Sequence, residues 1–158
     1  MWRTRVRPLI EAVGAVAVVV SVLFLAVQIK SSNDIAEAAI RYDLLMANNE
    51  WQDLVASDDD LGELLDRLRD AEIELSGGDR ERARAIAYRL ANQWAAVHAA
   101  YAMGQIPRWV FDGYSVDVSS RIDLYPGLVP FFRGYLIEYP HMQDLEIFAA
   151  VVDATGLR

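Results

Sequence analysis

An apolar run near the N-terminus, Leu9 to Ile29, constrains this chain more than any other feature. As a helix rising ~1.5 Å per residue, roughly 21 residues reach ~31 Å, about the thickness of the hydrocarbon core of a bilayer. Glu11 is the one charged residue inside the run. The sequence therefore predicts a single membrane-spanning helix over residues 9–29.

The polar and very small residues of this run share one side of the expected helix. They follow a three-four spacing within an arc of about 100°, which drifts in the sense of a left-handed supercoil. Val18 and Leu25 occupy the intervening positions of the same spacing. We call the whole set the polar stripe: Glu11, Gly14, Val18, Ser21, Leu25 and Gln28. The opposite side suits lipid and carries Val13, Val16, Val20, Leu23 and Val27. A glycine for close backbone approach and hydrogen-bonding side chains are typical of contacts between membrane helices, so we expect the stripe to be a contact surface.

Glu11 has three interpretations, because a carboxylate is costly inside a bilayer. The favoured one places it at the interface, one turn from the arginine-rich end, where Arg7 or Arg5 neutralises it. The others are a ring of carboxylates at the mouth of an oligomeric pore, and a polar contact to a partner subunit.

Basic residues predict how the helix is oriented. Arg3, Arg5 and Arg7 precede the run, whereas only Lys30 and the more distant Arg41 follow it. A cleaved signal peptide is the main rival, but the run is long, contains Glu11 and ends in Val27-Gln28-Ile29-Lys30 without an Ala-x-Ala type of cleavage site. We expect an uncleaved anchor in a bacterial inner membrane, with the N-terminus in the cytoplasm and the following domain in the periplasm. The opposite topology stays open.

Composition divides the 158 residues into a basic tail (1–8), the membrane helix (9–29) and an acidic domain (30–158). The formal net charge is −8, and after Lys30 11 basic and 22 acidic side chains leave −11. Nucleic acid and anionic lipid headgroups would both repel this domain, so we expect no nucleic-acid partner. The absence of cysteine excludes disulfides, thiolate catalysis and cysteine-held metals.

Helical periodicity continues to the C-terminus, without convincing strand alternation. No glycine or proline separates the anchor from a helical pattern at 33–55, so one helix can continue out of the membrane. Asp60 and Glu63 form an expected capping box for a second helix, and Asp79 is the expected cap of a third, which ends near Met103. Further helices are expected at 108–124, 130–139 and 142–154. The predicted fold is all-α: an N-terminal transmembrane helix followed by a small helical bundle.

Nothing in the domain carries a catalytic motif. The run Asp58 to Asp60 lacks the ligand spacing of a calcium-binding loop, so we expect these aspartates to cap a helix or face solvent. Neither His98 nor His141 belongs to a metal-binding pair, so we expect both histidines to have structural roles. Serine elbows and phosphate-binding or dinucleotide-binding glycine motifs are missing. We therefore expect no catalytic residues, metal or cofactor, and no enzyme. A set of aromatic residues forms either the core or a partner-binding face: Trp109, Phe111, Phe131, Phe132 and Tyr135.

The anchor also resembles that of a known group of proteins. Its residues Glu11-x-x-Gly14, Val18 to Ser21 and Leu25-Ala26-Val27-Gln28-Ile29-Lys30 are similar to the N-terminal segment of short, mostly proteobacterial single-pass membrane proteins of uncharacterised function. Gly104, Trp109 and Pro126-Gly127 also follow that pattern. The resemblance implies an all-helical domain after the anchor. It supplies no catalytic residues.

Two functional hypotheses follow. The first is a non-catalytic accessory or assembly subunit that contacts other subunits of a membrane complex through the polar stripe. The second is a self-assembling homo-oligomer, in which Glu11, Ser21 and Gln28 face the axis of a helix bundle. One form of such a bundle is a pore that these side chains line. A seam through Leu25, Gln28, Ser32, Ile35, Ala39, Tyr42 and Met46 keeps the same heptad outside the membrane and favours self-association.

Overall fold

The computed structural model describes the backbone of residues 3–157 and the side chains of residue 11 and residues 13–157. This part of the chain contains α-helices and short 3-10 helices and no strand, which confirms the predicted all-α class. Two compact units are present, Met1–Ala39 and Ile40–Arg158. The expected neutralising side chains of Arg5 and Arg7 lie outside the described residues.

The first helix, α1, is Arg3–Ser57, and its N-terminal portion makes up the first unit. The expectation of a helix that continues past Ile29 is confirmed. It begins earlier than the predicted span, since the backbone is already helical at Arg3. Neither glycine nor proline occurs between Gly14 and Ser57, so nothing in that stretch interrupts the backbone hydrogen bonds.

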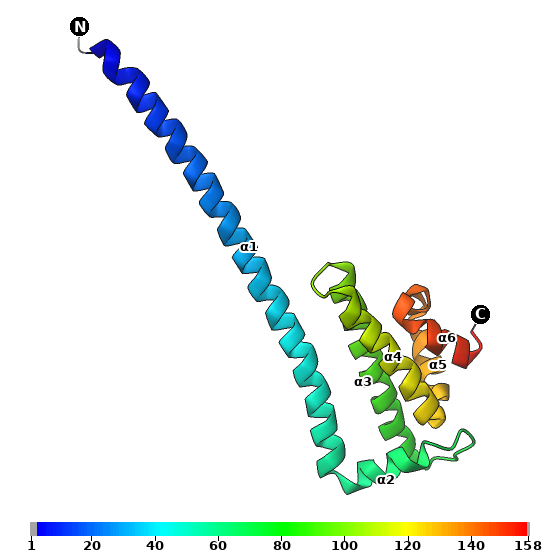
Figure 1. The fold of residues 1–158 in the computed structure, drawn as a ribbon. Helices are drawn as coiled ribbons and strands as arrows, with labels where there is room; N and C mark the ends of the chain where they lie inside the picture. The colour runs from blue at the N-terminus through cyan, green and yellow to red at the C-terminus, as the bar shows by residue number, and fades with distance from the viewer. Residues whose placement is uncertain (1–2, 158) are drawn as a thin grey trace. The chain divides into compact units, whose positions relative to one another are not determined.

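The second unit is a helical bundle (Figure 1). Besides the end of α1, it contains these elements: α2 (Asp59–Arg67), α3 (Gly77–Ala102), α4 (Arg108–Leu124), η1 (Pro126–Leu128), α5 (Val129–Glu138), η2 (Pro140–Asp144), η3 (Glu146–Phe148) and α6 (Ala149–Thr155). Helix α3 packs against α4 and α5, and α6 packs against α4 and α5. The predicted bounds of the helix over 108–124 are confirmed.

The core of the bundle is built around Trp94 on α3, which is fully buried. Its ring lies 5.2 Å from that of Phe132 and 6.2 Å from that of Phe148, centroid to centroid. Aromatic pairs at such distances add to the gain from burying their surface. Leu64 and Leu68 close the same core from the α2 side.

Two predicted helix caps are wrong. Asp58, not Asp60, caps α2: its backbone is extended, and its carboxylate accepts a hydrogen bond from the Leu61 backbone N–H at 3.0 Å. Asp79 lies inside the first turn of α3, for which Ser76 is the cap residue. There Asp79 accepts hydrogen bonds from Arg67 at 2.8 Å and from the Ser76 hydroxyl at 3.1 Å.

The predicted last helix over 142–154 is also wrong in its first half. That stretch contains parts of η2 and all of η3, separated by Leu145 in an extended conformation, and α6 begins only at Ala149. The inward direction expected for Phe148 and Val151 holds, since both are buried. Gly156 ends α6 with φ +65°, the left-handed conformation typical of a residue after a helix.

Candidate functional site

The first candidate surface is the apolar part of α1. It is the one helix among the described residues that is long and apolar enough to cross a membrane, and none of its most apolar stretch is buried. On its lipid-suited side Val16 is 62% exposed, and on the polar stripe Val18 is 63% exposed. Both sides of this segment are therefore available to lipid or to another protein.

The polar stripe offers a shallow hollow at its middle. Ala17 and Ser21 are small, and together with Val18, Val22 and Leu25 they line a depression on the side of α1. One turn before it, a Cβ added at Gly14 would meet nothing within 4 Å. Such a surface suits a neighbouring helix that approaches closely.

Ser21 is already part of a hydrogen bond within α1. Its hydroxyl donates to the Ala17 carbonyl at 2.7 Å. This bond uses the hydroxyl proton, so towards a neighbouring helix the oxygen acts as an acceptor. Glu11 and Gln28, the other hydrogen-bonding members of the stripe, are exposed.

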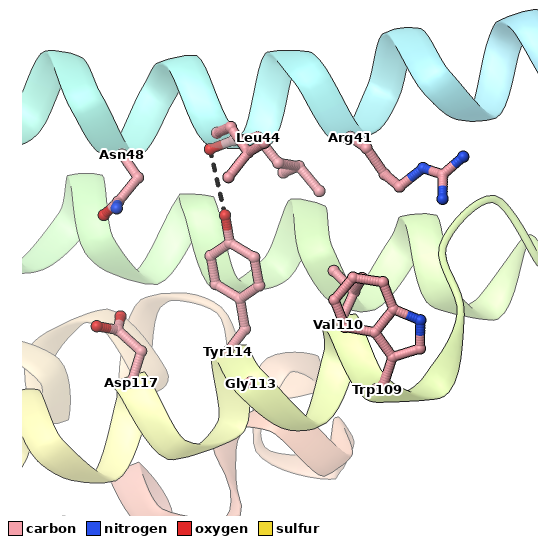
Figure 2. Close-up of a pocket in the computed structure, with 9 residues that line it drawn as sticks. Arg41, Leu44, Asn48, Trp109, Val110, Gly113, Tyr114 and Asp117 are labelled. Atoms are coloured by element: carbon pink, nitrogen blue, oxygen red, sulfur yellow. Dashed lines mark hydrogen bonds between the residues drawn. The ribbon is translucent and has the colours of Figure 1, made fainter.

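A second surface feature is a groove between α1 and α4, inside the second unit (Figure 2). The Tyr114 hydroxyl donates to the Leu44 carbonyl at 3.2 Å, and this bond joins the two helices. Burial raises the pKa of Tyr114 above its ordinary value, although a hydrogen bond with Gln93 opposes that shift. The groove is mostly apolar, with Arg41, Asn48 and Asp117 as its charged and polar members.

The predicted aromatic set divides between core and surface. Phe111, Phe132 and Tyr135 are buried, and Phe131 is half-buried. The Tyr135 hydroxyl donates to Asn92 Oδ1 at 2.9 Å. Trp109 differs from these four, since it is 71% exposed and lines the groove. Of the five, Trp109 is the one whose ring is open to a partner.

Arg108 holds the start of α4 in place beside Trp109. Its guanidinium makes an ion pair with Asp112 at 2.6 Å and with Glu146 of η3 at 2.8 Å. The Tyr101 side chain and the two carboxylates raise the pKa of Arg108 further above its already high value. The first turn of α4 is thus fixed to the C-terminal part of the bundle.

His98 is a partly buried residue on α3. Its ring lies 5.9 Å from that of Phe111, and its Nδ1 is buried without a hydrogen-bond partner within the described part of the chain. His141 is exposed, with its ring 6.5 Å from that of Tyr139. Among the side chains that the structure describes, no three His, Asp or Glu residues gather as metal ligands would.

Comparison with protein-family models, with curated proteins and with solved structures found no match to this chain. The geometry of the chain itself is therefore the basis for a functional proposal.

Proposed function

We propose that this protein is a non-catalytic, membrane-anchored interaction protein, an accessory or assembly subunit of a larger membrane complex. The polar stripe of α1 contacts other transmembrane helices of that complex. The observation that carries the proposal is the complete exposure of the apolar segment of α1. Exposed apolar surface costs about 25 cal/mol per Å² in water, so a helix of this kind needs lipid or protein around it.

The two sides of the segment differ in the partner that they fit. The valine-rich side offers only hydrocarbon and suits lipid chains. The polar stripe has an open glycine, a hollow at Ala17 and Ser21, and an amide at Gln28, features that support contact with protein.

We also propose a location. The three arginines before the apolar run favour an N-terminus in the cytoplasm and a bundle in the periplasm of a bacterium, with the helix in the inner membrane. The resemblance of the anchor to those of short proteobacterial membrane proteins supports the architecture, an anchor followed by a helical domain, and not the orientation.

Purification of the intact protein from its own membranes in a mild detergent, followed by native mass spectrometry, tests the proposed function. We expect a foreign subunit at a fixed ratio to this chain. A Gly14→Leu variant should lose that subunit, because the larger side chain blocks close approach, whereas Val16→Leu on the opposite side should keep it. A complex made only of multiples of 17.7 kDa would contradict an accessory role.

Topology has a separate test, which the absence of cysteine makes simple. A single cysteine at the exposed Gly78, in the second unit, should react in intact spheroplasts with a maleimide that cannot cross membranes. Labelling only after lysis would place the bundle in the cytoplasm instead.

A further inference from the structure

The part of α1 in the second unit is apolar on two opposite faces. One face packs onto the bundle: Trp51 is 5% exposed, and Leu44 is partly buried. At 100° per residue, Tyr42 and Met46 lie on the far side of the helix from these residues. They are 62% and 38% exposed. No other described segment of the chain covers this second face.

The exposed face continues the spacing of the polar stripe. From Leu25 the three-four pattern runs without interruption through Gln28, Ser32, Ile35, Ala39, Tyr42 and Met46. We call these seven residues the seam. Ile35, at its middle, is 68% exposed. A repeat of 3.5 residues kept over three heptads is the pattern of a helix that supercoils around another helix.

The apolar part of the seam, from Ile35 to Met46, ends where the next residues become polar. The positions that would follow Met46 in the same spacing are Asn49 and Asp53, both exposed. An apolar face bounded in this way has a defined length, as expected for a contact with one partner helix.

We propose that the seam pairs α1 with α1 of a second copy of this chain, in parallel and in register, from Leu25 to Met46. This inference rests on the proposed membrane anchor and names a partner for the part of α1 from Leu25 to Met46. Copies inserted in the same membrane share one orientation, so their helices run parallel. Each copy also carries the identical 3.5-residue pattern, which a helix from another protein would have to match.

The charges beside the seam support the parallel arrangement. On one flank the positions are Ala36, Asp43 and Glu50, and on the other they are Ser31, Ala38 and Leu45. In a parallel pair each flank faces the opposite flank of the partner, so the acidic side chains meet uncharged ones. An antiparallel pair would place acidic flank against acidic flank, which is unfavourable.

Pairing also leaves surface for other subunits. The first part of the polar stripe, from Glu11 to Ser21, and the acidic surface of the bundle lie outside the seam. A pair of copies is therefore compatible with an accessory role in a larger complex.

Single-cysteine variants in native membranes test the seam directly. Ile35→Cys, Tyr42→Cys and Met46→Cys replace exposed side chains, so folding should be retained, and Asp34→Cys is the matched control, exposed but on another side of α1. After oxidation with copper phenanthroline we expect dimers from the three seam variants at several times the yield of the control. Equal yields at all four positions, or no dimer at the seam, would overturn the proposal.

A second variant checks the same interface without a cross-link. Tyr42→Lys puts a charge into the seam, and we expect the number of copies per complex in native mass spectrometry to fall to one, with helicity unchanged by circular dichroism. An unchanged copy number would contradict the pairing.

The outcomes separate this inference from the proposed function. A membrane complex with a foreign subunit and a single copy of this chain would support the accessory role and overturn the pairing. A pure homo-oligomer would do the reverse. If alkaline carbonate released the chain from membranes, α1 would not be a membrane anchor. That result would overturn both the accessory role and the pairing, because both depend on the anchor.

Discussion

Gly127 occupies a position where a side chain has no room. A Cβ at this residue would lie 2.9 Å from the Leu68 and Asp70 carbonyl oxygens and 3.0 Å from Ile73 Cγ2. The Gly127 N–H also donates to the Leu68 carbonyl at 2.9 Å, so the two backbone segments are held together. Because two of the three contacts are with backbone atoms, the neighbours cannot simply rotate away.

We expect Gly127→Ala to destabilise the bundle by about 1–3 kcal/mol, the usual cost of overpacking a tight site. Urea unfolding followed by circular dichroism would measure this loss. Gly62→Ala is the matched control, because Gly62 lies in α2 with nothing within 4 Å of an added Cβ. That variant should gain up to about 1 kcal/mol from helix propensity. Equal effects at both positions would contradict the close approach.

Asp79 links stability to pH. The hydrogen bond from Arg67, together with that from Ser76, lowers the pKa of this carboxyl below its ordinary value of 3.8. A lowered pKa in the folded state stabilises the fold above the unfolded-state pKa, and the contribution is lost as the pH falls through the folded-state pKa.

We therefore expect Asp79→Asn to lower the melting temperature slightly at pH 7, and this difference from the unmodified protein to disappear as the pH falls below 3.8. Thermal unfolding at a series of pH values would measure it. A difference that is the same at pH 7 and at pH 2.5 would assign the loss to something other than the Asp79 charge.

The two wrong caps show what residue patterns leave open. Three aspartates in a row, Asp58 to Asp60, each have the chemistry of a cap. Which of them is extended depends on where α1 ends, and the residue types alone do not fix that position. Asp79 accepts from Arg67, a residue twelve positions earlier, so its role depends on the path of the intervening loop.

At the scale of elements, the sequence predicted the helices where a clear boundary residue coincided with a periodic pattern. Pro107 precedes α4, and its bounds were predicted despite Gly113 in its interior. The C-terminal segment was harder, because its apolar residues fit a helical spacing although Leu145 is extended. Tertiary contacts of Ile147 and Phe148 with the core outweigh the local preference there.

The end of α1 is attached to the bundle through few residues, and Trp51 is the largest of them. Its ring is buried, and the Arg89 guanidinium lies 5.8 Å from its centre. We expect Trp51→Ala to destabilise this attachment by about 3 kcal/mol. Hydrogen exchange should then speed up over the last turns of α1, while amides in α5 stay protected.

Gln52→Ala is the control for that experiment. Gln52 is the next residue on the same helix and is exposed, so its truncation should change stability by less than about 0.5 kcal/mol. If exchange in α1 rose equally in both variants, Trp51 would not be the attachment point.

The groove between α1 and α4 could not be predicted from the sequence. Tyr114 and Leu44 are 70 positions apart, and no local pattern relates them. The polar stripe, by contrast, was visible because it depends on spacing within a single helix. Trp109 belongs to the predicted aromatic set, but its exposure depends on how α4 packs against α3.

For the whole molecule, the net charge and the apolar surface of α1 predict opposite effects on membrane attachment. The net charge of −11 after Lys30 should repel anionic lipid, whereas α1 should hold the chain in the bilayer. We expect the protein to stay in the membrane fraction after washes with 1 M salt and with alkaline carbonate, and to be released by detergent. A chain lacking residues 1–30 should be recovered without detergent. Release by salt alone would identify electrostatic attachment and contradict the anchor.

The core of the bundle extends along the chain from Trp51 to Val152. During synthesis, α1 leaves the ribosome before the residues that complete the core. The bundle therefore cannot finish folding until α6 has been made and is free to pack against α4 and α5. Until then the emerging chain exposes apolar helix faces, and it depends on protection from proteases and from aggregation.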